Sequence, residues 1–204
     1  MNDPHRRRIV SWIGLLAASP LLPTPALADD PAATPEVEEG PFYPRAFPAD
    51  TDSDLTQVEG HVDRARGTPL ALSGRLLDRT GRPRVGSRIE IWQCDATGHY
   101  HHVRERDTVV DPDFQGFGTA VTDADGRYAF RTIRPVPYPG RTPHIHVAVV
   151  EQGKRRLTTQ LFVEGDPGNA RDGLYRALGS NAKLVTMKLE DRGGALAGGV
   201  DLVV

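Results

Sequence analysis

The sequence is poor in several features, and each shortage excludes a class of protein. Cys94 is the one cysteine among 204 residues, so an intrachain disulfide framework is excluded. The 25 basic side chains are outnumbered by 27 acidic ones, which leaves no cationic excess for binding nucleic-acid phosphates. Aromatic residues make up 6% of the chain, whereas glycine and proline, which weaken helix interiors, number 21 and 17. We therefore expect one domain of short strands and tight turns, with no nucleic-acid partner.

Residues 1–28 have the three-part layout of a secretory signal. Three arginines at 6–8 precede an apolar run at 9–22, and Ala-Leu-Ala at 26–28 supplies small residues for cleavage. The apolar run is shorter than the roughly 20 residues that cross a bilayer. Paired arginines followed by apolar residues favour twin-arginine export, and an ordinary Sec signal is the alternative. We predict a periplasmic or secreted protein with no membrane anchor after processing.

Residues 29–68 and 69–204 differ in pattern. The first stretch is rich in proline and acidic residues without a sustained period, which predicts an extended arm. The second reads as alternating strands separated by turn signals such as Asp-Ala-Asp-Gly at 123–126. The predicted strands are 70–77, 85–93, 117–122, 127–133, 144–150, 157–163, 183–189 and 200–204. With one short helix at 171–178, this pattern predicts an all-β fold, a two-sheet antiparallel β-sandwich with long loops.

His144 and His146 stand two residues apart in a predicted strand. Their side chains therefore project from one face, while Ile145 projects from the other. Two neutral imidazoles side by side can chelate iron, copper or zinc. A half-exposed strand whose histidines meet water fits the same pattern. Cys94, which follows an apolar stretch at 89–92, is expected to be buried.

Tyr100 and Tyr138 lie in irregular surroundings. Tyr138 stands between Pro137 and Pro139, where no regular strand ladder can run, six residues before His144. The prolines stiffen the loop, so the phenol loses little further entropy when it is held in place. A phenolate is a hard donor that favours a highly charged ion such as Fe(III). A surface loop whose tyrosine packs on a proline is the alternative.

Five segments resemble the intradiol ring-cleavage dioxygenases, and the protocatechuate 3,4-dioxygenase type most of all. They occur in the family's order between residues 39 and 167. The segments are EGPFYP at 39–44, IEIWQCDATGHY at 89–100, PVPYP at 135–139, RTPHIH at 141–146 and TQLFVEGDP at 159–167.

The resemblance implies one non-haem Fe(III) ion per chain. The implied ligands are Tyr100, Tyr138, His144 and His146. It also implies catalytic roles for Tyr138, as acceptor of a substrate proton, for Arg141, which would stabilise developing negative charge, and for Gln160 beside them. The implied reaction is O2-dependent cleavage of a catechol-type ring to a cis,cis-muconate-type diacid. An ion pair with a carboxylate is the alternative for Arg141.

The resemblance extends to the predicted arm. Gly40, Pro41, Phe42 and Tyr43 match a Gly-Pro-aromatic stretch that two-subunit members place near the pocket from the partner chain. We expect these four residues to line the substrate site, in cis or from a neighbour in a homo-oligomer. An anchor that fastens the arm to the sandwich is the alternative. Pro139 and Gly140 alone separate Tyr138 from Arg141, where protocatechuate enzymes usually carry a longer loop with an aromatic residue, so we expect the pocket to be either wider or shaped by another segment.

Two other classes of function fit parts of the pattern. One is a non-catalytic β-sandwich module that binds a ligand, since folds of this shape host many binders. The other is a zinc or Fe(II) enzyme in which His144 and His146 share the metal with a carboxylate such as Glu151 or Asp166.

Overall fold

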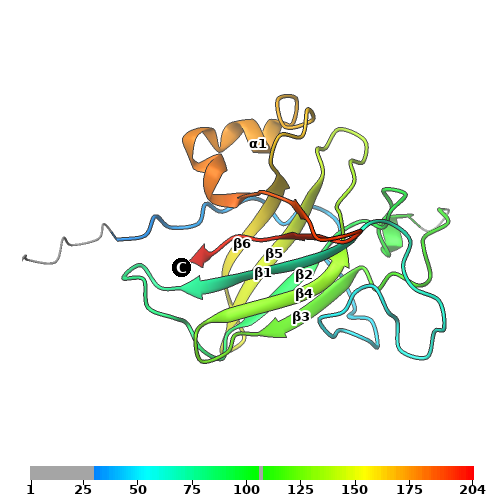
Figure 1. Cartoon of the computed structure of the whole chain (residues 1–204), viewed down its shortest axis with the longest axis horizontal. Helices are drawn as coiled ribbons and strands as arrows, with labels where there is room; N and C mark the ends of the chain where they lie inside the picture. Colours follow the sequence, from blue (N-terminus) through cyan, green and yellow to red (C-terminus); the bar gives the residue numbers. More distant parts are fainter. Residues whose placement is uncertain (1–29, 106–107) are drawn as a thin grey trace, which may run out of the picture.

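The computed structural model describes residues 30–105 and 108–204, so the predicted signal at 1–28 lies outside the described residues. Strands dominate the described part of the chain (Figure 1). The elements are β1 (Pro69–Leu77), β2 (Arg88–Trp92), η1 (Val103–Glu105), β3 (Phe117–Val121), β4 (Arg127–Ile133), β5 (His144–Glu151), β6 (Lys154–Val163), α1 (Gly173–Ala177), η2 (Gly179–Val185), β7 (Thr186–Met187), β8 (Glu190–Asp191), β9 (Leu196–Gly198) and β10 (Leu202–Val203).

The strands form two sheets that pack face to face, and the all-β sandwich prediction is confirmed. In the first sheet β1 pairs with β4 on one side and with β9 and β10 on the other, and β8 lies beyond β9. The second sheet has the order β3-β2-β5-β6-β7. Its central strands β2 and β5 are antiparallel, and this pairing sets Trp92 opposite His146. The second sheet thus carries the segments that the sequence marks as functional.

The C-terminal third differs from the prediction. Residues 183–185 belong to the 3-10 helix η2, in which Ala182 and Val185 are buried at the i, i+3 spacing of that helix type. The short strands β7, β9 and β10 pair in parallel with β6 or β1, so the sheets are mixed rather than wholly antiparallel. Parallel neighbours need a long connection, and α1 with η2 supplies it between β6 and β7.

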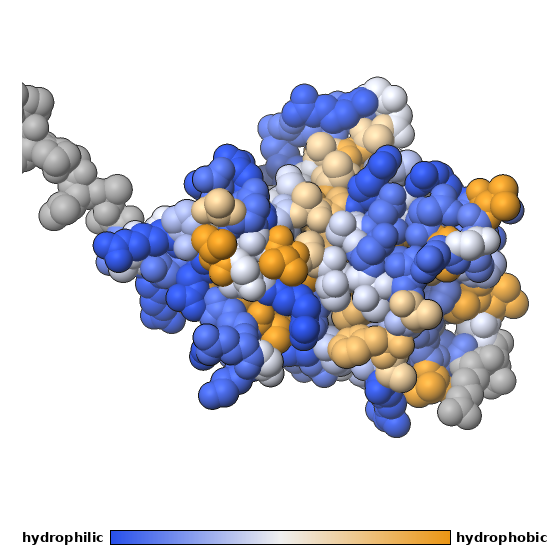
Figure 2. All heavy atoms as spheres, turned by 90° about the horizontal axis from the view of Figure 1, so that it is seen from below, coloured by the Kyte–Doolittle hydropathy of each residue, from blue (hydrophilic) through white to orange (hydrophobic). Residues whose placement is uncertain are grey.

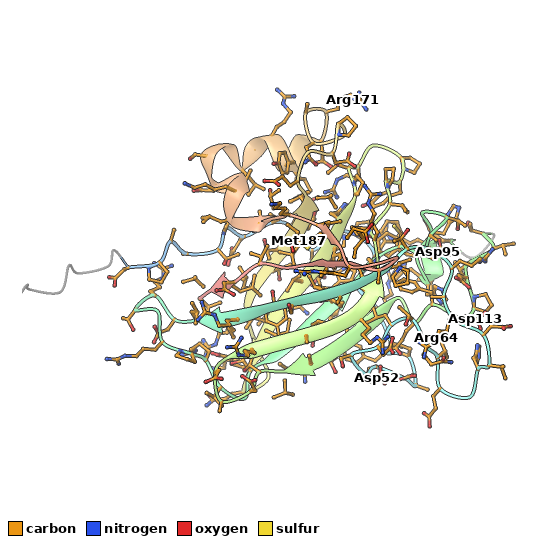
Figure 3. All side chains as sticks on the ribbon, in the orientation of Figure 1. Asp52, Arg64, Asp95, Asp113, Arg171 and Met187 are labelled. Atoms are coloured by element: carbon orange, nitrogen blue, oxygen red, sulfur yellow. The ribbon has the colours of Figure 1, made fainter. Side chains whose placement is uncertain are left out.

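Strand β5 is buried on both faces, and this explains where the site lies. Ile145, Val147 and Val149 point between the sheets and join the main core. The alternate residues point to the outer face, where Ala148 belongs to a second, smaller cluster of buried side chains. Cys94 is buried in that cluster, as predicted. Met187 lies in the main core, in the middle of the molecule (Figure 3).

Residues 30–68 run across the sandwich without joining a sheet as a strand. The backbone N–H of Thr34 donates to Val203 of β10, and that of Val37 donates to Thr158 of β6. Further along, Leu55 is fully buried in the main core and donates its N–H to Arg131 of β4. The arm therefore crosses the outer edges of both sheets and covers part of the second one, as the blue and cyan trace shows (Figure 1).

The surface seen from below is mostly hydrophilic, with small separate hydrophobic patches (Figure 2). Exposed apolar side chains such as Val62 and Val109 are scattered rather than gathered. Within residues 30–105 and 108–204, none of the helices combines the length and the apolar character needed to cross a membrane.

Candidate metal centre

His144 and His146 lie side by side on the outer face of β5. Their ring centroids are 4.8 Å apart, and their Nε2 atoms are 3.2 Å apart. The Nδ1 atom of His144 lies 2.6 Å from the carbonyl oxygen of Thr142, so it carries the proton and donates it there. The indole of Trp92 stacks flat on His146, with centroids 4.8 Å apart and planes 8° apart. Both imidazoles are thus fixed in orientation, and their Nε2 atoms face each other.

Tyr100 is carried to this face by the turn that follows β2. The carboxylate of Asp95 accepts hydrogen bonds from the N–H groups of Thr97, His99 and Asp111. Asp95 lies at the loop end of the sandwich, close to η1 (Figure 3). The buried Asp95 side chain thus joins the turn after β2 to the loop at Asp111. This holds the backbone that carries Tyr100 in one conformation. Sequence reasoning missed Asp95, although an aspartate before a Thr-Gly turn is a recognisable signal.

Tyr138 is placed by a tight turn. The N–H of Arg141 donates to the carbonyl of Tyr138 over 2.9 Å, and Gly140 adopts a φ of +82°. Proline followed by glycine with positive φ is the signature of a type II turn. The short Pro139-Gly140 link that the sequence shows is therefore a turn that sets Tyr138 and Arg141 beside each other. A side chain at Gly140 would meet no other atom within 4 Å, so the space beside this residue is open.

The four side chains implied as ligands converge. The ring centroids of Tyr100 and Tyr138 are 5.6 Å apart and those of Tyr138 and His144 are 5.4 Å apart. Tyr100 lies 6.2 Å from His146 by the same measure. The residues come from three separate segments, so only the folded sheet brings them together.

Burial controls the charge of these groups. Burial, followed by the charge of Arg141, lowers the pKa of His144 to about 4. Burial lowers the pKa of His146 well below its ordinary value, and burial raises the pKa of Tyr100 well above 10. Burial also raises the pKa of Tyr138, while Arg141 acts in the opposite direction. The imidazoles are therefore neutral at pH 7 and offer lone pairs, and the phenols need a strong positive charge nearby to ionise.

The donor set fits a ferric ion. Because Nδ1 of His144 donates a hydrogen bond to the Thr142 carbonyl, its Nε2 carries the lone pair, and this atom faces His146. Among the described residues, the Tyr100 hydroxyl is buried without a hydrogen-bond partner, which is rare unless another species satisfies the group. The Nε2 atoms are 3.2 Å apart. Two nitrogen ligands at right angles around one metal, with bonds of about 2.1 Å, would lie about 3 Å apart, so the observed separation suits a shared metal. Two nitrogens and two phenol oxygens together suit a hard, highly charged cation.

Arg141 is held at the edge of this cluster. Its Nε donates to Asp172 over 2.8 Å, one terminal nitrogen donates to Gln160, and the other lies 3.4 Å from the Tyr138 hydroxyl. The predicted ion pair and the predicted place in the site are therefore both present. Asp172 is fully buried and also accepts from the N–H groups of Thr142, Leu174 and Tyr175. Burial acts to raise its pKa, but these donors and Arg141 lower it on balance. Sequence reasoning missed Asp172, which caps α1 and is the second residue of the helix predicted at 171–178.

The arm reaches the cluster in cis. Gly40 has a φ of +70°, and a Cβ atom there would lie 3.4 Å from Cε1 of His146. Phe42 stacks on Tyr100 with centroids 4.3 Å apart and meets Tyr138 edge-on at 5.9 Å. The Tyr43 hydroxyl donates to Glu90 over 2.9 Å. Phe42 thus lies against the cluster, and Tyr43 anchors the arm to the sandwich. The lining role and the anchoring role considered for this segment fall on neighbouring residues. Pro41 is exposed.

The carboxylates proposed for a zinc or Fe(II) site are engaged elsewhere. Glu151 accepts from Arg84 and Ser87, and Asp166 accepts from the N–H of Gly168. In the part of the chain that the structure describes, no three side chains of His, Cys, Asp or Glu gather as a metal site. The histidine pair is accompanied by tyrosines instead.

Comparison with known sequences agrees with this arrangement. Residues 38–195 match the family model described as Dioxygenase. The beta chain of protocatechuate 3,4-dioxygenase from Burkholderia cepacia is 38% identical over 134 residues, which cover 61% of this chain and 57% of that protein. Catechol 1,2-dioxygenase 1 from Acinetobacter lwoffii is 30% identical over 183 residues, covering 81% of this chain and 56% of that protein. The chain thus spans little more than half the length of these relatives.

Solved structures are similar over more of their length. The dioxygenase domain of a dioxygenase carbohydrate-binding protein fusion from Streptomyces sp. SirexAA-E is 31% identical with a TM-score of 0.66, covering 85% of this chain and 98% of that one. An intradiol ring-cleavage dioxygenase from Tetranychus urticae is 27% identical with a TM-score of 0.68, covering 84% and 94%. From the matched family model and these relatives, the chain belongs to the intradiol ring-cleavage dioxygenases.

Proposed function

We propose that this protein is an exported non-haem Fe(III) dioxygenase that cleaves a catechol-type ring with O2. The observation that carries the proposal is the convergence of two buried histidines and two tyrosines beside Arg141. Both oxygen atoms of O2 enter the product, the bond between the two hydroxylated carbons breaks, and a cis,cis-muconate-type diacid results. This balance needs no further reductant.

Tyr100, Tyr138, His144 and His146 would hold one ferric ion per chain. Bound there, the ion would supply a Lewis acid for the two substrate oxygens and would accept electron density from the ring, which would make a ring carbon reactive toward O2. The chain's part is to supply neutral imidazoles and phenol oxygens in a site from which burial excludes most water.

The two tyrosines have different surroundings, and this suggests different roles. Tyr100 is 3% exposed and covered by Phe42, whereas Tyr138 is half-buried beside exposed prolines. The Tyr138 oxygen is therefore the one that substrate reaches, and it is placed to take a proton from a substrate hydroxyl. Arg141 lies 3.4 Å from the same oxygen, so it favours negative charge there and on a ring held nearby.

Asp172 and Gln160 act by keeping Arg141 in place. Gln160 accepts from Arg141 and donates its amide N–H to the carbonyl of Glu38 in the arm over 2.9 Å. The guanidinium is therefore tied to both the helix end and the arm, and its remaining nitrogen donates toward the Tyr138 hydroxyl, on the side that substrate would reach. A preorganised donor of this kind commonly lowers a barrier by about 2.7–4 kcal/mol.

The relatives' names suggest the substrates to screen first. They include enzymes named for protocatechuate, catechol and hydroxyquinol. The open side at Gly140 gives room for ring substituents near Tyr138. We propose a small catechol-type substrate, with O2 as the second substrate and a homo-oligomer as the working state.

The visible spectrum of the purified protein tests the proposal. Tyrosinate bound to Fe(III) absorbs visible light, so we expect a red to burgundy solution whose band shifts to longer wavelength when catechol is added without O2. The variant His144→Ala is the matched control and should lose the colour. A wild-type protein that stays colourless after ferric reconstitution would overturn the metal assignment and favour a ligand-binding module.

Export is the second part of the proposal, supported by the basic, apolar and small-residue order of residues 1–28. N-terminal sequencing of protein recovered from the periplasm of a bacterial host tests it. The expected N-terminus is Asp29. Changing the arginines at 6–8 to lysines should stop export by the twin-arginine route, and undiminished export would favour a Sec signal.

A further inference from the structure

The segment Glu39–Tyr43 is fastened at both ends and faces the metal centre in its middle. Its inner residues Gly40 and Phe42 lie against His146 and Tyr100. Its end residues point to the other side, toward strands β2 and β6. These ends bind Glu90 and Arg155, which are neither among the four implied ligands nor among the residues that hold Arg141.

Glu90 of β2 receives one end. Its side chain is 1% exposed, and one carboxylate oxygen accepts the Tyr43 hydroxyl over 2.9 Å. The other oxygen pairs with Arg88 on the same strand at 2.8 Å. Burial, followed by the hydrogen bond to Glu90, raises the pKa of Tyr43 to about 12, so the phenol stays protonated and remains a donor. A buried carboxylate is costly unless it is paired, so a buried Glu90 needs these partners.

Arg155 of β6 receives the other end. Its guanidinium donates to Glu39 over 2.6 Å and lies 3.5 Å from Glu90. The same group lies over the ring of Tyr43, 4.4 Å from the centroid. One arginine therefore contacts both ends of the segment and the buried carboxylate below it. Planar stacking and a forked donor pattern are properties that lysine lacks.

We propose that Glu90 and Arg155 are positioning residues for substrate binding. They hold the segment Glu39–Tyr43 against the sheet, so that Phe42 forms a fixed apolar wall next to Tyr100 and Tyr138. This inference rests on the proposed function, because it assigns the wall to the same site. Neither residue touches the four ligands, so they act through the arm.

The geometry explains why both fastenings are needed. Phe42 is half-buried, and its contacts are ring faces and edges without a hydrogen bond from its side chain. Stacking of this kind is weak for each pair and tolerates sliding. The position of the wall is therefore set by Glu39 and Tyr43 on either side. Pro41 between them limits the segment's freedom.

Chymotrypsin tests the fastening without any need for activity. Cleavage after Phe42 requires the segment to leave the sheet, so we expect Glu90→Gln and Tyr43→Phe to be cut there about fivefold to tenfold faster than wild type. The matched control Arg75→Gln removes a surface ion pair with Asp201 that contacts neither Glu90 nor the arm, and its cleavage rate should match wild type. If Glu90→Gln does not fold, Tyr43→Phe decides alone. Equal cleavage of Tyr43→Phe and wild type overturns the proposal.

Steady-state kinetics with the iron-loaded protein test the positioning. We expect KM for catechol to rise about fivefold to tenfold in Tyr43→Phe and Arg155→Lys, with kcat within about twofold of wild type and an unchanged visible spectrum. An unchanged KM overturns the role in substrate binding. If wild type cleaves no catechol, the proposed function fails, while the chymotrypsin result still decides whether Glu90 holds the arm through Tyr43.

Discussion

Replacing Asp172 by asparagine should damage both stability and turnover. The change keeps the shape of the side chain but leaves one carbonyl oxygen where two carboxylate oxygens serve four donors. If that oxygen keeps the helix N–H groups, Arg141 and the N–H of Thr142 lose their acceptor. The charged hydrogen bond contributes about 1.5–3 kcal/mol and the stranded N–H costs about 1–3 kcal/mol. The free energy of unfolding should therefore fall by about 3–5 kcal/mol, as for other broken buried pairs.

The assay combines thermal unfolding with O2 uptake. At about 2–4 °C per kcal/mol for a domain of this size, the melting temperature should drop by about 6–20 °C. A guanidinium displaced by about 1 Å should lower kcat up to about 100-fold. Asp201→Asn is the matched control, because Asp201 pairs with Arg75 at the surface, and it should cost no more than about 1 kcal/mol. If Asp172→Asn behaved like this control in both measurements, the assigned role of Asp172 would be wrong.

Three further changes have defined outcomes. His144→Ala should abolish iron binding by metal analysis, and a fully loaded variant would count against its place in the donor set. Tyr138→Phe should keep the fold and the melting temperature but lose most turnover, because the phenol oxygen that receives the substrate proton is gone; unchanged kcat contradicts this role. Acid should destabilise the metal-free protein. The pKa of His144 is about 4 in the folded chain and about 6.5 in the unfolded chain. Between these pH values the unfolded chain therefore binds more protons than the folded one. Chemical unfolding should show stability falling as pH drops from about 6.5 toward 4, with a smaller fall in His144→Ala; a flat profile refutes the argument.

The long strands and the chelating pair were predictable because their signals are local. The strand predicted at 144–150 corresponds to β5, and the two-residue period of a strand alone places the two imidazoles on one face, where the structure has them. A dipeptide such as Pro139-Gly140 favours a turn by itself, because proline restricts φ at the first position and glycine tolerates the positive φ at the second. The short strands β8 and β9 have two and three residues, too few for a period to emerge.

The supporting residues were not predictable for a different reason. Asp172 and Glu90 act on partners 31 and 47 residues away in the sequence, Arg141 and Tyr43. An acidic residue in a sequence reads first as a surface charge, and only the fold shows which ones are buried and paired. The cis placement of the arm depends likewise on contacts such as that between Gln160 and Glu38, which no local pattern encodes.

The pairing of β1 with β9 and β10 has a consequence for how the chain folds. The partners of Leu70 in β9 and of Leu76 in β10 lie more than a hundred residues further on, and Thr34 meets Val203 across 169 positions. Contacts of such separation slow folding, because the loop entropy is lost before the contact forms. During synthesis β1 can pair early with β4, but its other edge stays open until the last described strands leave the ribosome. In that interval the open edge is a template for pairing with other chains.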